Sequence, residues 1–324
     1  MKFIDFDTDG RLFESDTHKP IPGAQEVLVK VASFGVNRAD LLQVAGKYPP
    51  PKGASEILGM EISGVVEVVG EDVTTVDVGQ SICAMIAGGG YAQYAVVPSA
   101  HVIPMPENMS FSNAAAIPEV FLTATQALHK IADVTSADRL LIHAGASGLG
   151  SALIQLAKLH SVQVAVTASS ESKLNYCRDL GADITINYSV DSFKEQLQAM
   201  RFFPDIIVDI VAGNYVNDNL SLLANDGVIV QLAMLQGRYV ERLDMANILA
   251  KRAGIKGSTL RNRSDDYKTE LVKNFVNRYW HRFHTGELQA CVDAIFPISE
   301  ITKAHECMRL NRNKGKLVIS TQDW

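Results

Sequence analysis

The sequence predicts an α/β protein with two domains, one β-rich and one built on a doubly wound parallel sheet. Three observations lead to this prediction. The chain has 324 residues, more than a single hydrophobic core usually organises. Strand-like runs separated by Gly, Pro and Asp dominate residues 1–105. From residue 138 onward, strand-like and helix-like segments alternate, as in βαβ units of a parallel sheet.

The β-rich part is predicted from runs of β-branched and aromatic residues. Strands are expected at 27–31, 64–69 and 94–97, because these runs lie between turn-forming residues. A helical pattern begins at 112–116 and resumes over 122–131.

The alternating part opens with a glycine turn between a strand and a helix. An apolar run at 140–142 is followed by small residues that include Gly145, Gly148 and Gly150, and apolar positions then recur at helical spacing over 151–159. Small residues let the backbone approach a pyrophosphate, which the helix N-terminus attracts. The glycines do not follow strict G-x-G-x-x-G spacing, so a tight turn without a ligand is the alternative. The strand–turn–helix context favours a dinucleotide site.

The remaining elements follow the same alternation until the C-terminal segment. A long amphipathic helix is predicted over 266–284, and we expect the C-terminal segment to close back onto the β-rich domain. Further strands are predicted at 162–167, 184–186, 206–210, 228–232, 255–257, 294–297 and 316–320, and helices at 172–180, 191–200, 214–223 and 298–311.

Composition excludes several classes of function. The net charge is −6 and the pI about 5.8, which argues against nucleic acid or an anionic membrane as partner. No uninterrupted apolar run reaches the ~18 residues of a membrane span. The four cysteines are far apart and form no C-x-x-C pair, so neither a zinc ribbon nor a disulfide framework is indicated. No apolar signal segment is seen in MKFIDFDTDG, and a cytoplasmic location is expected.

Five local motifs, in this order along the chain, resemble one family. They are FGVNRAD (34–40), GKYPPP (46–51), LGMEISG (58–64), HAGASG (143–148) and NRNKGK (311–316). The chain resembles the zinc-independent quinone oxidoreductases of the medium-chain dehydrogenase/reductase superfamily, in particular the tumour-suppressor-inducible branch, over essentially its whole length. The resemblance implies a GroES-like catalytic domain from residues 1–117 and 289–324 and a Rossmann NADP(H)-binding domain from 118–288. It also implies NADPH as cofactor and a homodimer.

The resemblance also implies that no metal takes part. At the places where zinc-dependent relatives have their ligands, this chain has Asn37, Met60 and Glu119. Amide and thioether groups are poor substitutes for thiolate and imidazole. Glu61 can be interpreted as a leftover ligand, but a single carboxylate cannot build a tetrahedral site, and a hydrogen-bonded acid in a turn is the preferred interpretation.

The choice of nicotinamide cofactor depends on the residues after the second strand of the alternating part. NAD enzymes place an acid there to bind the ribose 2′-OH, whereas this strand ends in Ala168-Ser169-Ser170. In the family, Lys and Tyr at the places of Lys173 and Tyr188 hold a 2′-phosphate. We therefore predict an NADP(H) clamp of Ser169, Lys173 and Tyr188. Glu171 would suit NAD, but a first-turn helix acid is the preferred interpretation, and a solvated helix lysine remains the alternative for Lys173.

Three residues are candidates for the catalytic cleft by resemblance. Asn37 is expected to bind a substrate carbonyl or the nicotinamide ribose. Tyr48 donates to the developing quinol oxygen, stacks on the ring, or is only a turn tyrosine. Ser147 touches the diphosphate or the substrate, or only closes the turn. The other cofactor contacts implied by the family fall on Thr123, Leu149, Met234, Leu235, Ser258, Thr259 and Leu260, while Asn311 replaces a basic residue of several relatives and its role is open.

The predicted function is NADPH-dependent reduction of a quinone by hydride transfer, with a proton from solvent or Tyr48. The first alternative is a 2-alkenal or enoyl reductase, because its substrates are also conjugated carbonyls. A non-catalytic NADPH-binding or RNA-binding protein is the second alternative, and the acidic pI counts against RNA.

Overall fold

The computed structural model describes residues 1–135 and 138–324. The chain divides into two compact units, which we call the terminal unit (Met1–Leu122 and Leu260–Trp324) and the central unit (Thr123–Thr259). Residues 118–122 and 260–288 belong to the terminal unit, so the compact units differ from the domain ranges expected from the sequence, which remain a prediction. Every helix of the described residues is too short or too polar to cross a membrane.

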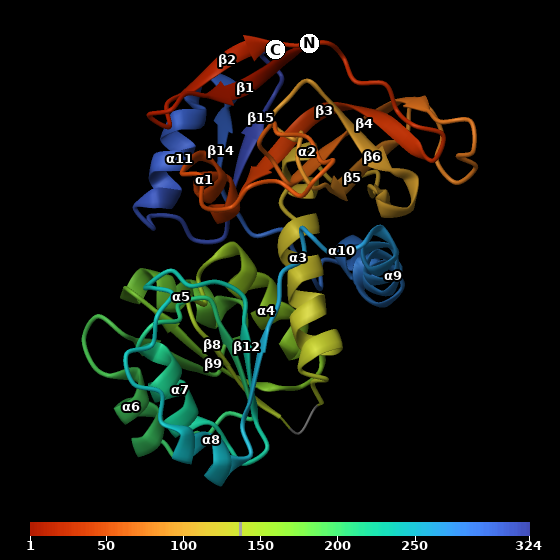
Figure 1. Cartoon of the computed structure of the whole chain (residues 1–324). Coiled ribbons are helices and arrows are strands. Elements are labelled where there is room, and N and C mark those ends of the chain that lie inside the picture. The colour runs from red at the N-terminus through yellow and green to blue at the C-terminus, as the bar shows by residue number, and fades with distance from the viewer. Residues whose placement is uncertain (136–137) are drawn as a thin grey trace. The chain divides into compact units, whose positions relative to one another are not determined.

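The terminal unit is built on a seven-stranded sheet in the order β14-β15-β3-β4-β5-β7, with β6 also paired to β3 (Figure 1). Its C-terminal strand β15 runs antiparallel to β3, which confirms that the C-terminal segment returns to the β-rich part of the chain. The β1–β2 hairpin forms a separate two-stranded sheet. The strands are β1 (Lys2–Phe6), β2 (Leu12–Asp16), β3 (Glu26–Val36), β4 (Glu61–Val69), β5 (Ser81–Met85), β6 (Tyr94–Pro98), β7 (Ile103–Pro104), β14 (Val292–Pro297) and β15 (Lys316–Ser320).

Helices of the terminal unit are mostly short. The predicted long helix over 266–284 is confirmed as a continuous run, in which α9 passes through a π-helical segment into α10. Ser264 begins α9 by accepting a hydrogen bond from the Tyr267 N–H. The helices are α1 (Arg38–Val44), η1 (Ser99–His101), α2 (Phe111–Ala114), α3 (Pro118–Thr125, which crosses the unit boundary), α9 (Asp265–Phe275), η3 (Val276–Trp280), α10 (His281–Thr285), η4 (Ile298–Glu300) and α11 (Ile301–Arg309).

The central unit is a parallel sheet in the order β10-β9-β8-β11-β12-β13 (Figure 1). This is the doubly wound order in which the chain starts in the middle and winds outward in both directions, so the predicted fold class is confirmed. Its strands are β8 (Arg139–Ile142), β9 (Gln163–Ala168), β10 (Ile184–Asn187), β11 (Ile206–Asp209), β12 (Val228–Gln231) and β13 (Gly254–Gly257). Its helices are η2 (Gln126–Ile131), α4 (Gly148–Leu159), α5 (Glu171–Asp179), α6 (Phe193–Ala199), α7 (Tyr215–Leu222) and α8 (Met245–Lys251).

Burial explains why the central strands form where they do. Leu140–Ile142 of β8 and Ile206–Val208 of β11 are at most 3% exposed, as expected for strands covered by helices on both faces. Helices α6 and α7 pack against the sheet, and Leu141, Ile207 and Leu220 lie in one apolar cluster there. The sheet is therefore a rigid base for the loops at its carboxyl edge.

Candidate active site

Most predicted cofactor residues lie just after the ends of strands in the central unit. Gly145–Gly150 follow β8, Ser169 follows β9, Tyr188 follows β10, Met234 follows β12 and Ser258 follows β13. All six strands are parallel, so their carboxyl ends share one edge of the sheet. Ligands of doubly wound proteins bind at this edge, near the place where the strand order reverses, which here lies between β8 and β11.

The glycine turn after β8 is closely packed. A Cβ atom on Gly150 would lie 2.4 Å from the carbonyl oxygen of Gly145, and one on Gly145 would lie 2.7 Å from the Val166 side chain. Ser147 begins α4 and accepts a hydrogen bond from the Gly150 N–H at 3.0 Å. The N–H groups of Gly148 and Leu149 precede the first i−4 carbonyl of the helix, so they are available for an anion.

A series of hydrogen-bonded, buried polar side chains lies next to this turn. The Nδ1 atom of His143 is 3.0 Å from the Thr167 hydroxyl, and its Nε2 atom is 2.7 Å from Oδ1 of Asn219. Asn219 in turn donates to Asp209 at 3.0 Å, and Asp209 accepts the N–H of Val211. Burial lowers the pKa of His143, so the neutral ring links the ends of β8, β9 and β11 without adding a charge at the edge.

The predicted 2′-phosphate clamp is built from the ends of β9 and β10. Lys173 lies in the first turn of α5, which begins at the cap residue Ser170. Tyr188 follows β10 and is 41% exposed, so its ring is accessible to a ligand. Glu171, the acid that would favour NAD, forms an ion pair with Arg178 at 2.6 Å, which offsets its negative charge beside the clamp.

The remaining predicted cofactor residues are divided between the two units. Met234 and Leu235 are 61% and 47% exposed in the loop after β12, and Thr123 lies on α3. Leu260 is buried in the terminal unit. Asn311, also in the terminal unit, has a φ of +53° just after α11 and accepts a hydrogen bond from Arg38 at 2.5 Å.

Asn37 begins helix α1 in the terminal unit and is 8% exposed. Its side-chain Nδ2 donates to Glu61 at 2.9 Å, and its Oδ1 accepts from Lys316 at 2.6 Å. Lys316 and Glu61 are themselves an ion pair at 2.5 Å. Asn37 is a predicted site residue, and Glu61 was predicted to be a hydrogen-bonded acid. No role was predicted for Lys316, although it ends the NRNKGK motif.

Tyr48 lies in the loop after α1, and Arg261 holds that loop. The Arg261 guanidinium is 5.5 Å from the Tyr48 ring centroid and donates to the carbonyl of Ala87 at 2.7 Å and the side chain of Gln43 at 2.8 Å. Burial raises the pKa of Tyr48, Glu119 raises it further, and Arg261 lowers it. The hydroxyl therefore stays protonated at neutral pH and is able to donate a hydrogen bond. No pattern in the sequence indicated a role for Arg261.

Asp40 extends the network around Asn37 to Tyr91 and His305. Its carboxylate accepts the Asn37 backbone N–H at 2.7 Å and the Tyr91 hydroxyl at 3.1 Å. The Tyr91 oxygen lies 2.9 Å from Nε2 of His305. Burial raises the pKa of Asp40 to about 6 and lowers the pKa of His305 to about 4.

These two shifts predict opposite effects of acid on stability. Native Asp40 binds its proton more tightly than unfolded Asp40 (pKa 3.8), so its stabilising contribution is complete below pH ~4 and is lost as pH rises through about 6. Native His305 resists protonation compared with its ordinary pKa of 6.5, so its contribution is present above pH 6.5 and is lost as pH falls toward 4. Each effect is about 3 kcal/mol, from ~1.4 kcal/mol per pKa unit.

Between pH 7 and pH 4, therefore, Asp40→Asn should lose about 2–3 kcal/mol more unfolding free energy than wild type, and His305→Gln about 2–3 kcal/mol less. Urea unfolding followed by tryptophan fluorescence measures this in the right unit, because both tryptophans, Trp280 and Trp324, lie in the terminal unit. If the change in unfolding free energy between pH 7 and pH 4 differed from that of wild type in the same direction in both variants, the pKa shifts assigned to Asp40 and His305 would be contradicted.

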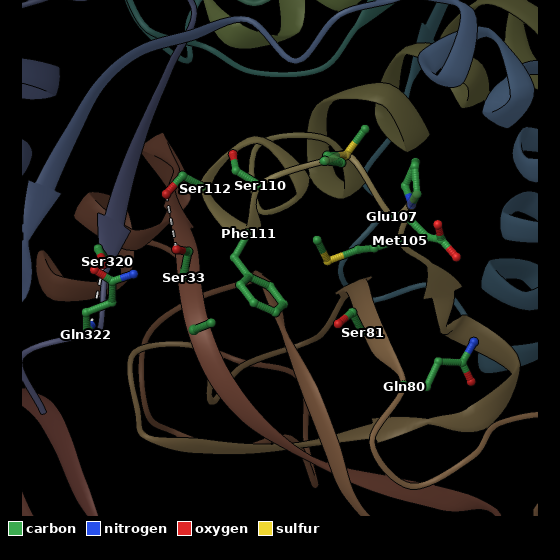
Figure 2. Close-up of a pocket in the computed structure, with 13 residues that line it drawn as sticks. Ser33, Gln80, Ser81, Met105, Glu107, Ser110, Phe111, Ser112, Ser320 and Gln322 are labelled. Atoms are coloured by element: carbon green, nitrogen blue, oxygen red, sulfur yellow. Dashed lines mark hydrogen bonds between the residues drawn. The ribbon is translucent and has the colours of Figure 1, made fainter.

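The terminal unit has a cavity that is lined by none of the predicted site residues. It has a volume of about 590 Å³ and is lined by hydroxyl groups together with Met105 and Phe111 (Figure 2). The hydroxyl groups of Ser33 and Ser112, both in the lining, form a hydrogen bond at 3.3 Å (Figure 2). Neither Asn37 nor Tyr48 lines this cavity, so it is not part of the candidate site.

Two family models match the chain. The alcohol dehydrogenase GroES-like domain covers residues 23–107, and the zinc-binding dehydrogenase model covers residues 148–277. The quinone oxidoreductase of Mus musculus is 26% identical over 312 residues, which are 94% of this chain and 92% of that protein. The synaptic vesicle membrane protein VAT-1 homolog of Danio rerio is 29% identical over 321 residues. These are 94% of this chain and 66% of that protein.

Solved structures show the same architecture. The Pseudomonas syringae quinone oxidoreductase has a TM-score of 0.86 at 26% identity and covers 99% of both chains. The Thermus thermophilus quinone oxidoreductase, also solved with NADPH, has a TM-score of 0.84 at 28% identity and covers 99% of this chain and 100% of that one. The CurK enoyl reductase has a TM-score of 0.85 at 25% identity and covers 98% of each chain.

The fold and the glycine-turn edge thus define a two-domain oxidoreductase with a GroES-like and a Rossmann part. The chain belongs to the medium-chain dehydrogenase/reductases and is quinone oxidoreductase-like. Membership of this family suggests that the chain binds a nicotinamide cofactor.

Zinc, which one of the matching models carries in its description, does not fit the residues found here. Asn37 stands at the expected ligand position, but its amide is engaged by Glu61 and Lys316. The Lys316 ammonium already places a positive charge among these oxygen atoms. Within residues 1–135 and 138–324, no group of three or more His, Cys, Asp or Glu side chains is arranged to hold a metal ion.

Proposed function

We propose that this protein is an NADPH-dependent quinone reductase. The observation that carries the proposal is the composition of the edge after β9 and β10, where Ser169, Lys173 and Tyr188 follow the two strands. The acid in the first turn of α5, Glu171, is paired with Arg178. A 2′-phosphate is favoured by such a site, whereas a ribose 2′-OH is usually bound by an unpaired acid. The Thermus thermophilus relative solved with NADPH supports the same cofactor.

The residues of this chain have separate tasks in the proposed reaction. The N–H groups of Gly148 and Leu149 would hold the diphosphate, with Ser147 fixing the helix start. Ser169, Lys173 and Tyr188 would hold the 2′-phosphate. The bound nucleotide supplies the hydride. Asn37 would orient an oxygen atom of the ligand and Tyr48 would donate to the reduced oxygen, with solvent as the other proton source.

An enoyl or 2-alkenal reductase is the second candidate function. The observation that favours it is the likeness to the CurK enoyl reductase, which is as similar in fold as the quinone oxidoreductases. Quinones and enones are both conjugated carbonyls, so the same donors serve both. RNA binding without catalysis is disfavoured by the net charge of −6.

A panel of substrates assayed with NADPH tests the proposal. Ortho- and para-quinones should have higher kcat/KM than enones and 2-alkenals. If enones exceed quinones by more than about tenfold, which is ~1.4 kcal/mol in barrier, the enoyl reductase function replaces the quinone reductase function.

Tyr48→Phe should lower kcat about 10- to 100-fold if the hydroxyl donates a proton or hydrogen bond to the reduced oxygen. The ring and its contact with Arg261 remain in this variant, so the binding of NADPH should not change. Tyr239→Phe is the matched control, because Tyr239 is 77% exposed in the central unit. Unchanged turnover in Tyr48→Phe would reduce the role of Tyr48 to stacking.

We also propose a homodimer, as the family resemblance implies, located in the cytoplasm. β13 is an edge strand of the central sheet and exposes Ile255 at 42%, and such edges are usually covered. The four cysteines are free thiols, in keeping with a reducing compartment. Sedimentation showing only monomer at micromolar concentration would contradict the dimer.

A further inference from the structure

Two buried charged side chains, which are paired with each other, hold the amide of Asn37. Lys316 is 3% exposed and Glu61 is completely buried, and their ion pair has an N–O distance of 2.5 Å. Between them, the Asn37 amide donates to Glu61 at 2.9 Å and accepts from Lys316 at 2.6 Å. The three groups thus form a closed triangle of charge-assisted hydrogen bonds, which are stronger than those between neutral groups.

This triangle permits only one orientation of the amide. If the amide were rotated by 180° about its χ2 angle, its NH₂ group would face the ammonium and its oxygen would face the carboxylate, so both contacts would become repulsive. The ammonium is fully used, because its third donor reaches the Val36 carbonyl at 3.2 Å. The second carboxylate oxygen of Glu61 accepts the Glu119 N–H at 2.9 Å.

The fold reserves space for this carboxylate. A Cβ atom on Gly35 in β3 would lie 2.2 Å from Oε1 of Glu61 and 2.8 Å from the carbonyl oxygen of Ala115. Only glycine at position 35 therefore leaves room for the Glu61 side chain to reach Asn37. Burying an ion pair is weak support for stability by itself, because a well-packed apolar pair often stabilises a core equally well. The cost of burial is more readily explained by the orientation that the pair imposes.

We propose that Lys316 and Glu61 are positioning residues that fix Asn37 as a hydrogen-bond donor. With Oδ1 facing Lys316 and one Nδ2 hydrogen facing Glu61, the second Nδ2 hydrogen remains, and within the described residues no side chain accepts it. Asn37 keeps 8% of its surface exposed, and in this proposal the second hydrogen is donated to a ligand oxygen, either a substrate carbonyl or a ribose hydroxyl. The catalytic part of the inference rests on the proposed reductase function; the fixed orientation does not.

Three variants separate positioning from stability. Lys316→Met leaves the Glu61 carboxylate buried and unpaired, so it should lower both the thermal midpoint and kcat. Glu61→Gln leaves the ammonium without its charged partner and should act likewise. The double variant Lys316→Met/Glu61→Gln removes both charges, so its thermal midpoint should recover toward wild type. Its Asn37 amide has lost the donor to Oδ1, and the side chain introduced by Glu61→Gln offers both a donor and an acceptor, so a single orientation is no longer enforced and kcat or the NADPH Kd should stay about 10- to 100-fold worse.

The matched control is Lys194→Met/Asp218→Asn, which removes an exposed ion pair with an N–O distance of 3.4 Å and should change neither stability nor kinetics. A loss confined to kcat and the quinone KM assigns the Asn37 donor to the substrate, and a parallel loss in NADPH affinity assigns it to the ribose. A double variant with wild-type stability and wild-type kinetics would overturn the catalytic role.

The orientation itself is tested without activity. In ¹⁵N NMR spectra, the Asn37 side-chain NH₂ signals are assigned by their loss in Asn37→Ser. The hydrogen that faces Glu61 should exchange with solvent at least about tenfold more slowly in wild type than in the double variant. Equal exchange would overturn the proposal. If wild type shows slow exchange but neither binds NADPH nor reduces quinones, the proposed function fails while the positioning by Lys316 and Glu61 stands.

Discussion

Gly150→Ala should weaken NADPH binding by about 100-fold or more. The new Cβ would lie 2.4 Å and 2.6 Å from the backbone oxygens of Gly145 and Ala144, so the turn has to open. Opening displaces the N–H groups of Gly148 and Leu149, and each charge-assisted hydrogen bond to a phosphate contributes about 1.5–3 kcal/mol. Titration followed by the fluorescence of the bound nucleotide measures the loss, because the central unit contains no tryptophan.

The control is Gly254→Ala in the same unit. A Cβ at Gly254 meets its nearest neighbour, the Val228 side chain, at 3.6 Å, which is ordinary van der Waals contact, so NADPH affinity should stay within about twofold. If Gly150→Ala binds NADPH as tightly as the control while its circular dichroism is unchanged, the turn after β8 does not hold the diphosphate.

Lys173→Ala should weaken NADPH by about 10- to 100-fold and leave NADH within about twofold. Only NADPH carries the 2′-phosphate, and the loss of one lysine–phosphate contact costs about 1.5–3 kcal/mol. The selectivity ratio between the two nucleotides is the quantity to measure, at one fixed salt concentration because the contact is ionic.

Lys194→Ala provides the control for net charge, since Lys194 lies on α6 in the same unit and its ion pair with Asp218 is one-third exposed. It should leave the ratio of NADPH to NADH affinity unchanged. Equal losses for both nucleotides in Lys173→Ala would contradict a 2′-phosphate clamp and would point to a general effect on α5.

The parallel sheet of the central unit was predictable from sequence because its strands are short, apolar and separated by amphipathic helices. The predicted strands at 140–142 and 184–186 fall within β8 and β10. The family resemblance, not periodicity, directed attention to Asn37 and Tyr48. The network around Asn37 was not predictable from local patterns, because its hydrogen bonds join residues 24 and 279 positions apart in the sequence.

Arg261 and His143 show the same limit in different ways. Arg261 acts on Gln43 at a separation of 218 residues, so no local pattern announces it. His143 lies inside the HAGASG motif, but its function as a link between Thr167 and Asn219 depends on strand order in the sheet. Motifs can mark the residues of a site, whereas the hydrogen-bond partners that give an orienting residue its role are found only when the tertiary fold is known.

The central claim is that the edge of the central sheet binds NADPH for the reduction of a conjugated carbonyl. Paired titration of the wild-type protein with NADPH and NADH, followed by NADPH oxidation with an ortho-quinone, tests it most directly. The account predicts tighter binding of NADPH than of NADH, and oxidation that depends on the quinone. Binding without quinone turnover would direct the assay to enones, and no binding of either nucleotide would contradict the account at the glycine turn.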